Sequence, residues 1–197
     1  MIKTKRIKKA AERIYIDRQD VEDILSDISY RRHVERYGMV RQWCYGNVLD
    51  FASGCGYGSW MISHNPDVKR VTGIDIDEEA IEYAKENFSD KNVKFLNINA
   101  LEASDYLKKD GISEIDVLVS LETIEHIEDA TLVPTVADLV KAKTVIVSFP
   151  SKKSTHFNPY HCHDFRTQDI LDLFTNYILI EEIVLYKELT ILRLIRK

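Results

Sequence analysis

The chain has 197 residues, of which 45% are hydrophobic and 30% charged, and its formal net charge at pH 7 is −5. This length fits one α/β domain with small additions and is too short for two full catalytic domains. No apolar run is long enough to span a bilayer, so we expect no transmembrane segment. The acidic balance, with a pI of about 5.7, argues against nucleic acid as the main partner, because phosphate-binding domains are usually basic.

The basic N-terminal segment, residues 1–9, lacks the apolar core and the small-residue cleavage site of a secretory signal. Cys44, Cys55 and Cys162 are scattered and lack the paired spacing of a disulfide framework or a zinc knuckle. We therefore expect reduced thiols and a cytoplasmic location. For the basic residues themselves, a solubilising tail is favoured over a phosphate-binding arm.

Residues 1–45 have helical rather than strand character. Asp20 is a predicted N-cap, and apolar residues follow it at helical spacing. A second helix is expected over about 30–44, where Tyr37 and Val40 belong to an apolar pattern with three-residue steps and should face the core. The sequence thus predicts a helical N-terminal extension before the first strand.

A glycine-rich turn divides an apolar run from a helical pattern at residues 48–59. Its glycines, Gly54, Gly56 and Gly58, allow left-handed backbone angles and let a ligand approach without meeting a Cβ. The helix that follows directs unpaired N–H groups toward the same place. This pattern predicts a nucleotide-like ligand, and the alternative is a turn that only reverses the chain.

Beyond this turn, β-branched apolar runs alternate with helical segments. Runs typical of buried strands lie at residues 71–75, 93–96, 115–120 and 144–149. Asp77 is expected to cap the helix after the second strand, because Glu78 and Glu79 follow it in the first turn. Such alternation favours an α/β fold with a parallel, doubly wound sheet and helices on both faces.

The C-terminal part departs from this alternation. After a helix predicted over about 167–174, two apolar runs at residues 177–186 and 189–195 are separated by only Lys187 and Glu188. So short a connection permits an antiparallel hairpin and excludes a parallel crossover. The sheet is therefore expected to be mostly parallel and to end in an antiparallel hairpin.

Asp75 ends the second predicted strand, where doubly wound folds place an acid that binds ribose hydroxyls. Two ligand classes fit this pattern: a nicotinamide or flavin dinucleotide, and S-adenosylmethionine. The dinucleotide fingerprint G-x-G-x-x-G would need a glycine where Ser59 stands, and the chain leaves no room for a separate substrate domain. The glycines instead follow Asp50 as G-x-G-x-G, which favours S-adenosylmethionine.

These stretches together resemble a known family. Residues 48–59 resemble motif I of class I S-adenosylmethionine-dependent methyltransferases. Residues 73–77 resemble the second strand of that family with its ribose-binding acid, and residues 99–101 stand where the family contacts adenine. Residues 120–126 are similar to the fourth-strand motif of the small-molecule branch, and residues 33–37 to a helix that precedes motif I in glycan-associated members.

The resemblance implies a Rossmann-like, doubly wound, mostly parallel seven-stranded sheet. It divides the chain into a helical extension over residues 1–45 that roofs the cofactor site and a methyltransferase domain over residues 46–197. The implied cofactor is S-adenosylmethionine, and Arg36 or Tyr37 is a candidate contact for its carboxylate. The predicted cofactor contacts are Arg36, Asp50, Ser53, Gly54, Gly56, Gly58, Asp75, Ile76, Asn99, Ala100 and Leu121.

Two positions depart from the family pattern. Ser53 stands where many relatives have a cysteine or a glycine, and its small side chain should be tolerated. Asn99 replaces the commoner aspartate, and its amide can still both donate to and accept from the adenine edge. We expect these changes to weaken electrostatic contacts without abolishing cofactor binding.

Histidines are the candidate catalytic residues at the acceptor end. His126 follows the fourth strand and titrates near neutrality, so it could act as the base for a hydroxyl acceptor, the alternative being a capping role. The long loop over residues 150–166 is expected to face the acceptor, because such loops usually carry specificity. Within it, residues 158–161 resemble a loop of glycan-related methyltransferases, which makes His161 the second candidate.

The same loop raises the question of a metal. His156, His161, His163 and Asp164 could bind zinc or nickel through their side chains. Their spacing matches no standard ligand set. We therefore expect an unliganded polar loop and no metal.

The sequence predicts an enzyme that transfers a methyl group from S-adenosylmethionine to an oxygen of a small molecule or glycan. A nucleic-acid or protein methyltransferase is the alternative within enzymes. The Asn-Pro-Pro-Tyr motif of DNA amino-methyltransferases is missing after the fourth strand, where Leu121-Glu122-Thr123 stands. A nucleotide-binding protein without turnover is the alternative outside enzymes.

Overall fold

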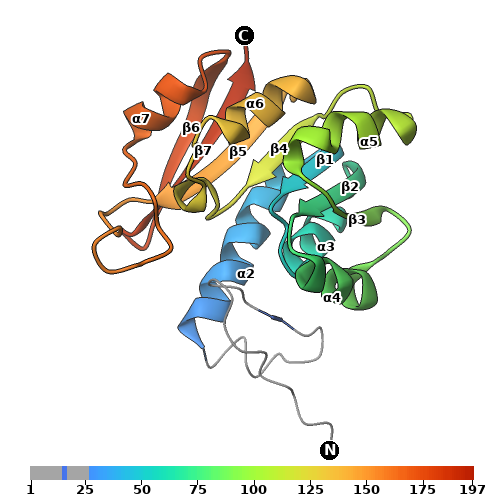
Figure 1. Cartoon of the computed structure of the whole chain (residues 1–197), viewed down its shortest axis with the longest axis horizontal. Coiled ribbons are helices and arrows are strands. Elements are labelled where there is room, and N and C mark those ends of the chain that lie inside the picture. The colour runs from blue at the N-terminus through green and yellow to red at the C-terminus, as the bar shows by residue number, and fades with distance from the viewer. Residues whose placement is uncertain (1–14, 17–26) are drawn as a thin grey trace, which may run out of the picture.

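The structure is a computed structural model that describes residues 15–16 and 27–197. The helix predicted to begin at Asp20 lies outside these residues. Figure 1 shows a central sheet with helices on both of its faces. Along the described part of the chain, no helix combines the length and the apolar character that a membrane span requires.

Seven strands form one sheet in the order β3-β2-β1-β4-β5-β7-β6. Strands β1 to β5 run parallel, whereas β7 runs antiparallel to both β5 and β6. The strands are β1 (Gly46–Phe51), β2 (Val68–Asp75), β3 (Val93–Asn97), β4 (Val117–Ser120), β5 (Thr144–Pro150), β6 (Tyr177–Leu185) and β7 (Leu189–Arg196). This topology confirms the predicted mostly parallel, doubly wound α/β sheet with its C-terminal antiparallel hairpin.

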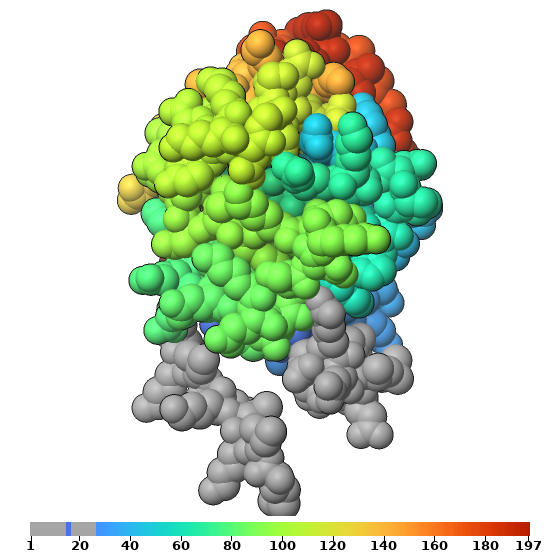
Figure 2. All heavy atoms as spheres, turned by 90° about the vertical axis from the view of Figure 1, so that its right-hand side faces the viewer, coloured from blue at the N-terminus to red at the C-terminus, as the bar shows by residue number. Residues whose placement is uncertain are grey.

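Two hydrophobic cores lie on the two faces of the sheet, because successive strand residues point to opposite sides. Val48 belongs to the core that also contains residues of α2, α3 and α4, and Leu49 to the core shared with α5, α6 and α7. These helices are α2 (Ile28–Val40), α3 (Tyr57–Ser63), α4 (Glu78–Phe88), α5 (Ala103–Lys109), α6 (Leu132–Leu139) and α7 (Thr167–Leu173). Figure 2 views the molecule from the β3 side, where the green and yellow-green atoms form one continuous surface.

Helix α2 (Ile28–Val40) corresponds to the second predicted helix. Asp27 caps it by accepting a hydrogen bond from the Ser29 amide, and Tyr37 and Val40 are buried as expected. The α-helix ends earlier than predicted because its last turn tightens into a 3₁₀ turn, η1 (Arg41–Trp43). Helix α4 also begins as predicted, since the Asp77 side chain accepts a hydrogen bond from the Ala80 amide.

Two strands begin two or three residues away from the predicted start, and four strands, β3, β5, β6 and β7, end one residue away from the predicted end. Strand β2 begins at Val68 rather than at residue 71, because Val68 already pairs with Gly46 of β1. Strand β4 begins at Val117 rather than at residue 115, because the Ile115 amide donates to the carbonyl of Val140 before the chain joins the sheet. Neither shift moves the carboxyl end of its strand.

The strand order reverses at β1, which lies between β2 and β4. The chain first adds β2 and β3 on one side of β1 and then crosses to β4 and β5 on the other. In open α/β sheets, a crevice forms at the carboxyl ends of the strands where this reversal occurs, and ligands bind there. The end of β2 and the loops after β1, β4 and β5 supply residues to this crevice.

Candidate active site

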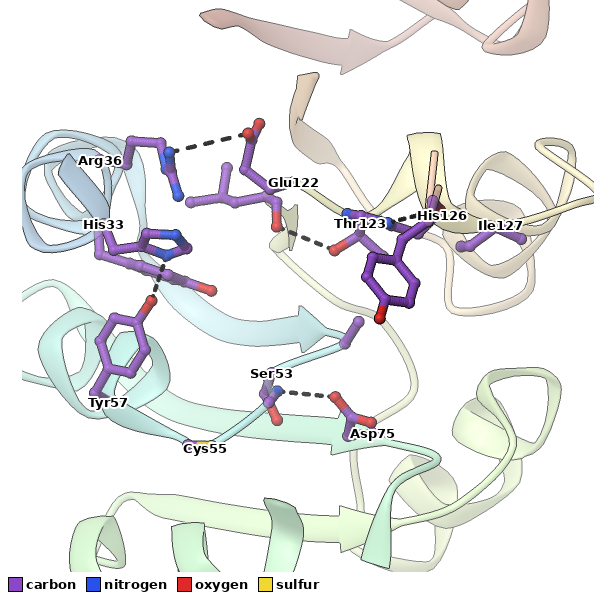
Figure 3. Close-up of a pocket in the computed structure, with 15 residues that line it drawn as sticks. His33, Arg36, Ser53, Cys55, Tyr57, Asp75, Glu122, Thr123, His126 and Ile127 are labelled. Atoms are coloured by element: carbon purple, nitrogen blue, oxygen red, sulfur yellow. Dashed lines mark hydrogen bonds and ion pairs between the residues drawn. The ribbon is translucent and has the colours of Figure 1, made fainter. Parts of the chain in front are cut away.

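A cavity of about 390 Å³ lies at this crevice, a volume within the range of small-molecule sites. Figure 3 shows its lining, with α2 on one side, the loop after β1 below it, and the segment after β4 on the other side. The lining residues are His33, Arg36, Tyr37, Ala52, Ser53, Gly54, Cys55, Tyr57, Asp75, Leu121, Glu122, Thr123, His126, Ile127 and Tyr160.

The loop after β1 turns through left-handed backbone angles at Ala52, Gly54 and Gly56, with φ values of 57°, 52° and 86°. A Cβ built on Gly54 would meet no atom within 4 Å, and Gly54 lines the cavity. The absent side chain therefore leaves its backbone open to a ligand.

The other two glycines serve packing. A Cβ on Gly56 would lie 2.6 Å from the Cβ of Ala84 and 2.7 Å from the Phe95 ring, and a Cβ on Gly58 would lie 2.2 Å from the Tyr37 ring. Neither glycine belongs to the cavity lining. The G-x-G-x-G pattern thus combines one ligand-facing position with two positions that let the loop and α3 pack closely against neighbouring elements.

Asp75 lies at the carboxyl end of β2 and faces the cavity (Figure 3). Its Oδ2 accepts a hydrogen bond of 2.9 Å from the Gly54 amide, and its Oδ1 accepts one of 2.9 Å from the Asp77 amide. Each carboxylate oxygen can accept a further hydrogen bond. The side chain is therefore held in place by the backbone and presents two acceptors, as the two hydroxyls of a ribose require.

Asp50 is fully buried beneath the loop and lies outside the cavity lining. It accepts hydrogen bonds from Ser59 Oγ at 2.6 Å and from the Tyr37 hydroxyl at 3.4 Å. Burial raises the pKa of its carboxyl from 3.8 to about 7, against the opposing effect of these two hydrogen bonds. Asp50 thus connects β1 to α3 and α2 through hydrogen bonds.

Arg36 and Glu122 form a charged pair at the cavity wall (Figure 3). Arg36 Nη1 lies 3.9 Å from Glu122 Oε2, and the Arg36 Nε is buried without a hydrogen-bond partner among the described residues. Glu122 has a left-handed φ of 50°, and Ser148 Oγ donates to its Oε1 at 2.9 Å. The strained backbone of Glu122 aims its carboxylate toward α2 rather than toward solvent.

His33 and Tyr57 form a neutral polar pair in the cavity. The Tyr57 hydroxyl lies 2.8 Å from His33 Nδ1. Burial, together with the positive charge of Arg36, lowers the pKa of His33 from 6.5 to about 3, and burial raises the pKa of Tyr57. Because both groups are uncharged at neutral pH, this side of the cavity offers hydrogen bonding without net charge.

His126 and His161 meet at the other side of the cavity. His126 lines it, and its Nδ1 lies 3.0 Å from the carbonyl oxygen of Tyr160, another lining residue. The two imidazole rings stand edge to face with centroids 4.6 Å apart. His161 Nδ1 lies 2.6 Å from Ser154 Oγ. The loop after β5 therefore folds back on the segment after β4 and brings both predicted histidines together.

The structure gathers about half of the predicted site residues around the cavity. Those that line it are Arg36, Ser53, Gly54, Asp75, Leu121 and His126. The others lie outside the lining: Ile76, Asn99 and Ala100 follow the adjacent strands β2 and β3, and the Asn99 side chain accepts a hydrogen bond from the Leu101 amide. Ile76 is 76% exposed, which is unusual for an isoleucine.

Sequence reasoning missed several lining residues, among them His33, Tyr57, Glu122, Thr123 and Tyr160. Glu122 and Thr123 stand inside the predicted motif after the fourth strand, and Tyr160 stands beside His161, so a signal existed for these three. His33 and Tyr57 gave no sequence signal as a pair, because they come from α2 and α3 and meet only in the folded chain.

Comparisons with known proteins agree with this geometry. Residues 48–143 match a family model described as "Methyltransferase domain". A Mycolicibacterium smegmatis protein named "Probable S-adenosylmethionine-dependent methyltransferase" is 27% identical over 73% of this chain. A Fusobacterium nucleatum release factor glutamine methyltransferase is 33% identical over 65% of this chain. The chain spans only 56% and 34% of the lengths of these two relatives.

Among solved structures, N-methyltransferase NodS from Bradyrhizobium japonicum WM9, in complex with S-adenosyl-L-homocysteine, has the same fold. Its TM-score is 0.66 at 16% sequence identity, and the match covers 90% of this chain and 92% of that one. The matched family model covers β1 to α6, which contain the glycine loop, Asp75 and the segment after β4. Residues 48–143 therefore match the methyltransferase domain family in sequence, and the chain shares the fold of a solved methyltransferase.

Proposed function

We propose that this protein transfers a methyl group from S-adenosylmethionine to an oxygen of a small-molecule or glycan acceptor. One observation carries the proposal: the cavity at the strand-order reversal has Asp75 and Gly54 on one side and His126 on another. The first two residues suit a nucleoside and the third suits an acceptor.

We further propose that residues 1–45 form a roofing extension of the domain over residues 46–197, and that the protein is cytoplasmic, as its three free thiols suggest.

The residues around the cavity fit the cofactor. Asp75 presents two carboxylate oxygens for the ribose hydroxyls, and the open backbone of Gly54 admits close contact. Arg36, with its buried Nε lacking a hydrogen-bond partner among the described residues, would bind the carboxylate of the methionine part. Ser53 also lines the cavity, next to Gly54. The exposed Ile76 would cover one face of the adenine.

For methyl transfer from a sulfonium, the main task of the protein is to align the methyl donor with the acceptor. When bound, S-adenosylmethionine would supply an electrophilic methyl carbon. Transfer would break the bond from this carbon to sulfur, leave its electron pair on sulfur, form a bond to the acceptor oxygen and pass the hydroxyl proton to a base. The cavity walls align the two reactants and exclude water. Imidazole can assist a hydroxyl acceptor either as a base or as the ligand of a metal that binds the hydroxyl. His126 and His161 are the residues proposed for that task.

The loop after β5 favours a sugar-like acceptor. Phe157 and Tyr160 are exposed aromatic residues on it, and Tyr160 also lines the cavity. Aromatic rings with one free face suit the apolar face of a sugar ring, and the Tyr160 hydroxyl adds a polar group. This loop thus offers exposed aromatic side chains beside the cavity, which supports a sugar-like acceptor.

A protein acceptor is the second candidate. The observation that favours it is the match to a release factor glutamine methyltransferase, which is the more identical of the two curated relatives. Under this alternative, the exposed aromatic residues Phe157 and Tyr160 would contact a peptide. Hydroxyl chemistry would then not be needed, because a glutamine offers an amide nitrogen.

A methyl-transfer assay separates these acceptor classes. The full chain is incubated with methyl-labelled S-adenosylmethionine and a panel of hydroxylated glycosides, O-acetylated glycosides as matched controls, bacterial release factors and RNA. We expect label in the free hydroxyl compounds and none in their acetylated counterparts. Label confined to protein or RNA would overturn the proposed acceptor class, and cofactor binding without transfer to any acceptor would indicate a binding protein.

A further inference from the structure

We propose that Glu125, His126 and His161 bind a divalent transition-metal ion at the edge of the cavity. Each residue offers one ligand atom, a carboxylate oxygen or a ring nitrogen, and these atoms all lie within 4.8 Å of one another. Glu125 is 1% exposed and the two histidines are half-buried. A cation bound between them would offset the free energy needed to bury the carboxylate.

The two segments that supply the ligands are fastened together by other groups. The Cys162 amide donates to the carbonyl of Glu125 at 2.7 Å. His163 Nε2 lies 3.1 Å from the carbonyl oxygen of Ile127 and 3.0 Å from that of Glu128. None of these contacts uses a proposed ligand atom. The three ligands are therefore brought together by the fold itself, before any ion binds.

The histidines are oriented as metal ligands usually are. His126 Nδ1 lies 3.0 Å from the Tyr160 carbonyl oxygen, which can only accept, so Nδ1 carries the proton and Nε2 the lone pair. That Nε2 lies 4.0 Å from Glu125 Oε1. His161 Nδ1 lies 2.6 Å from Ser154 Oγ, which in turn lies 3.5 Å from Asp164 Oδ1. Ligating imidazoles typically bond a carbonyl, hydroxyl or carboxylate through the other ring nitrogen in this way.

The donor set selects the kind of metal. Two imidazole nitrogens and one carboxylate oxygen suit zinc, iron, cobalt or nickel rather than calcium or magnesium, which prefer oxygen ligands alone. Three protein ligands leave coordination positions open, and His126 places the site at the cavity wall. An oxygen bound there would have its pKa lowered, which is what a hydroxyl acceptor needs before it can attack. This last step rests on the proposed function, whereas metal binding does not.

The structure also explains why the loop by itself gives no ligand set. Asp164 accepts hydrogen bonds from the Ser154 and Thr155 amides, and His163 faces two carbonyl oxygens, so both shape the loop. His156 is exposed and stands edge to face with Phe157. Of the four loop residues considered from sequence, only His161 contributes to the cluster, and its partners come from the segment after β4.

A metal titration tests the proposal without any activity assay. The full, untagged chain is stripped of metal and titrated with Co²⁺, followed by visible absorption, and with Zn²⁺, followed by calorimetry. We expect about one ion per chain. Ser154→Ala, which removes the hydrogen bond to His161, should weaken affinity by about 10- to 100-fold, and His161→Ala and Glu125→Gln by at least as much. His156→Ala is the matched control on the same loop and should bind as the wild-type chain does.

Each outcome bears on one claim. Absence of stoichiometric Co²⁺ or Zn²⁺ binding in the wild-type chain would overturn the metal site, and so would an unchanged affinity in both His161→Ala and Glu125→Gln. Thermal melting of each variant shows whether it is folded, and S-adenosylhomocysteine binding is measured in parallel. A chain that binds S-adenosylhomocysteine but no metal keeps the proposed function and loses this inference. A chain that binds metal but not S-adenosylhomocysteine keeps the metal site and contradicts the proposed function.

Discussion

Asp75 is the residue that joins the glycine loop to the proposed cofactor site. The Gly54 amide donates to one of its carboxylate oxygens and the Asp77 amide to the other, so the side chain cannot turn away from the cavity without losing both hydrogen bonds. A ribose would then meet acceptors that are already in position. Such preorganisation reduces the entropy lost on binding.

We predict that Asp75→Asn weakens S-adenosylhomocysteine binding by about 10- to 100-fold, because hydrogen bonds to a charged group are each worth about 1.5–3 kcal/mol and one of the two acceptors becomes a donor. Isothermal titration calorimetry measures this loss. Asp105→Asn is the control, since its carboxylate is exposed on α5 and lies outside the cavity lining. Equal affinities for the two variants would contradict the role assigned to Asp75.

Asp50 makes the stability of the fold depend on pH. The folded chain keeps its proton up to about pH 7, whereas the unfolded chain releases it near its ordinary pKa of 3.8. Folding therefore takes up a proton between these values, and the contribution of Asp50 to the free energy of unfolding falls as pH rises from 4 to 7. The pKa of His33 is lowered from 6.5 to about 3, so its contribution to the free energy of unfolding rises as pH rises from 3 to 6.5.

In Asp50→Asn, the free energy of unfolding should no longer fall because of this carboxyl as pH rises from 4 to 7. We therefore predict that the variant becomes more stable relative to the wild-type chain over this range, by up to about 4 kcal/mol. Urea unfolding at several pH values measures the difference, and the His33 contribution cancels between the two proteins. Parallel stability curves for variant and wild type would show that the Asp50 carboxyl titrates alike in the folded and unfolded chains.

At the scale of elements, the close contact of α3 with α2 depends on a glycine. Gly58 lies in the first turn of α3, and its missing side chain makes room for the Tyr37 ring of α2. Gly38, within α2, lies in a looser place, since a Cβ there would come no closer than 3.8 Å to the Met61 side chain. Space for an added methyl group is therefore available at Gly38 and absent at Gly58.

We predict that Gly58→Ala destabilises the protein by about 1–3 kcal/mol, because the new methyl group overlaps the Tyr37 ring and one of the two must move. Gly38→Ala should instead stabilise it by about 0.5–1 kcal/mol, because alanine is the better helix former and space is available. Denaturant unfolding of the two variants gives both values. A similar effect of both substitutions would indicate that helix propensity, rather than space at Gly58, decides the outcome.

Across the whole molecule, the fold was predictable because its signals are local. The β-branched runs, the Asp77 cap and the two-residue connection at Lys187 and Glu188 each specify their own element, and together they fix a mostly parallel sheet with a final hairpin. The site was only partly predictable. Asp75 and Gly54 stand where strand ends place them, so the motif positions sufficed for these two.

The remaining parts of the site depend on contacts between distant segments. His33 meets Tyr57, and Glu125 and His126 meet His161, only once α2 and the loop after β5 have packed. The glycine pattern gave no indication of which glycine faces a ligand, because packing against Tyr37 and a ligand's approach both require a missing side chain. The spacing of glycines along the chain cannot distinguish a glycine needed for packing from one needed for ligand binding, because both needs arise from tertiary structure.

The central claim is that the cavity binds S-adenosylmethionine rather than a dinucleotide. Isothermal titration of the full chain with S-adenosylmethionine, S-adenosylhomocysteine and NAD tests it most directly. We predict about one site per chain for the first two ligands, weakened in Asp75→Asn, and no measurable binding of NAD. Tight binding of NAD, with neither S-adenosylmethionine nor S-adenosylhomocysteine bound, would contradict the account.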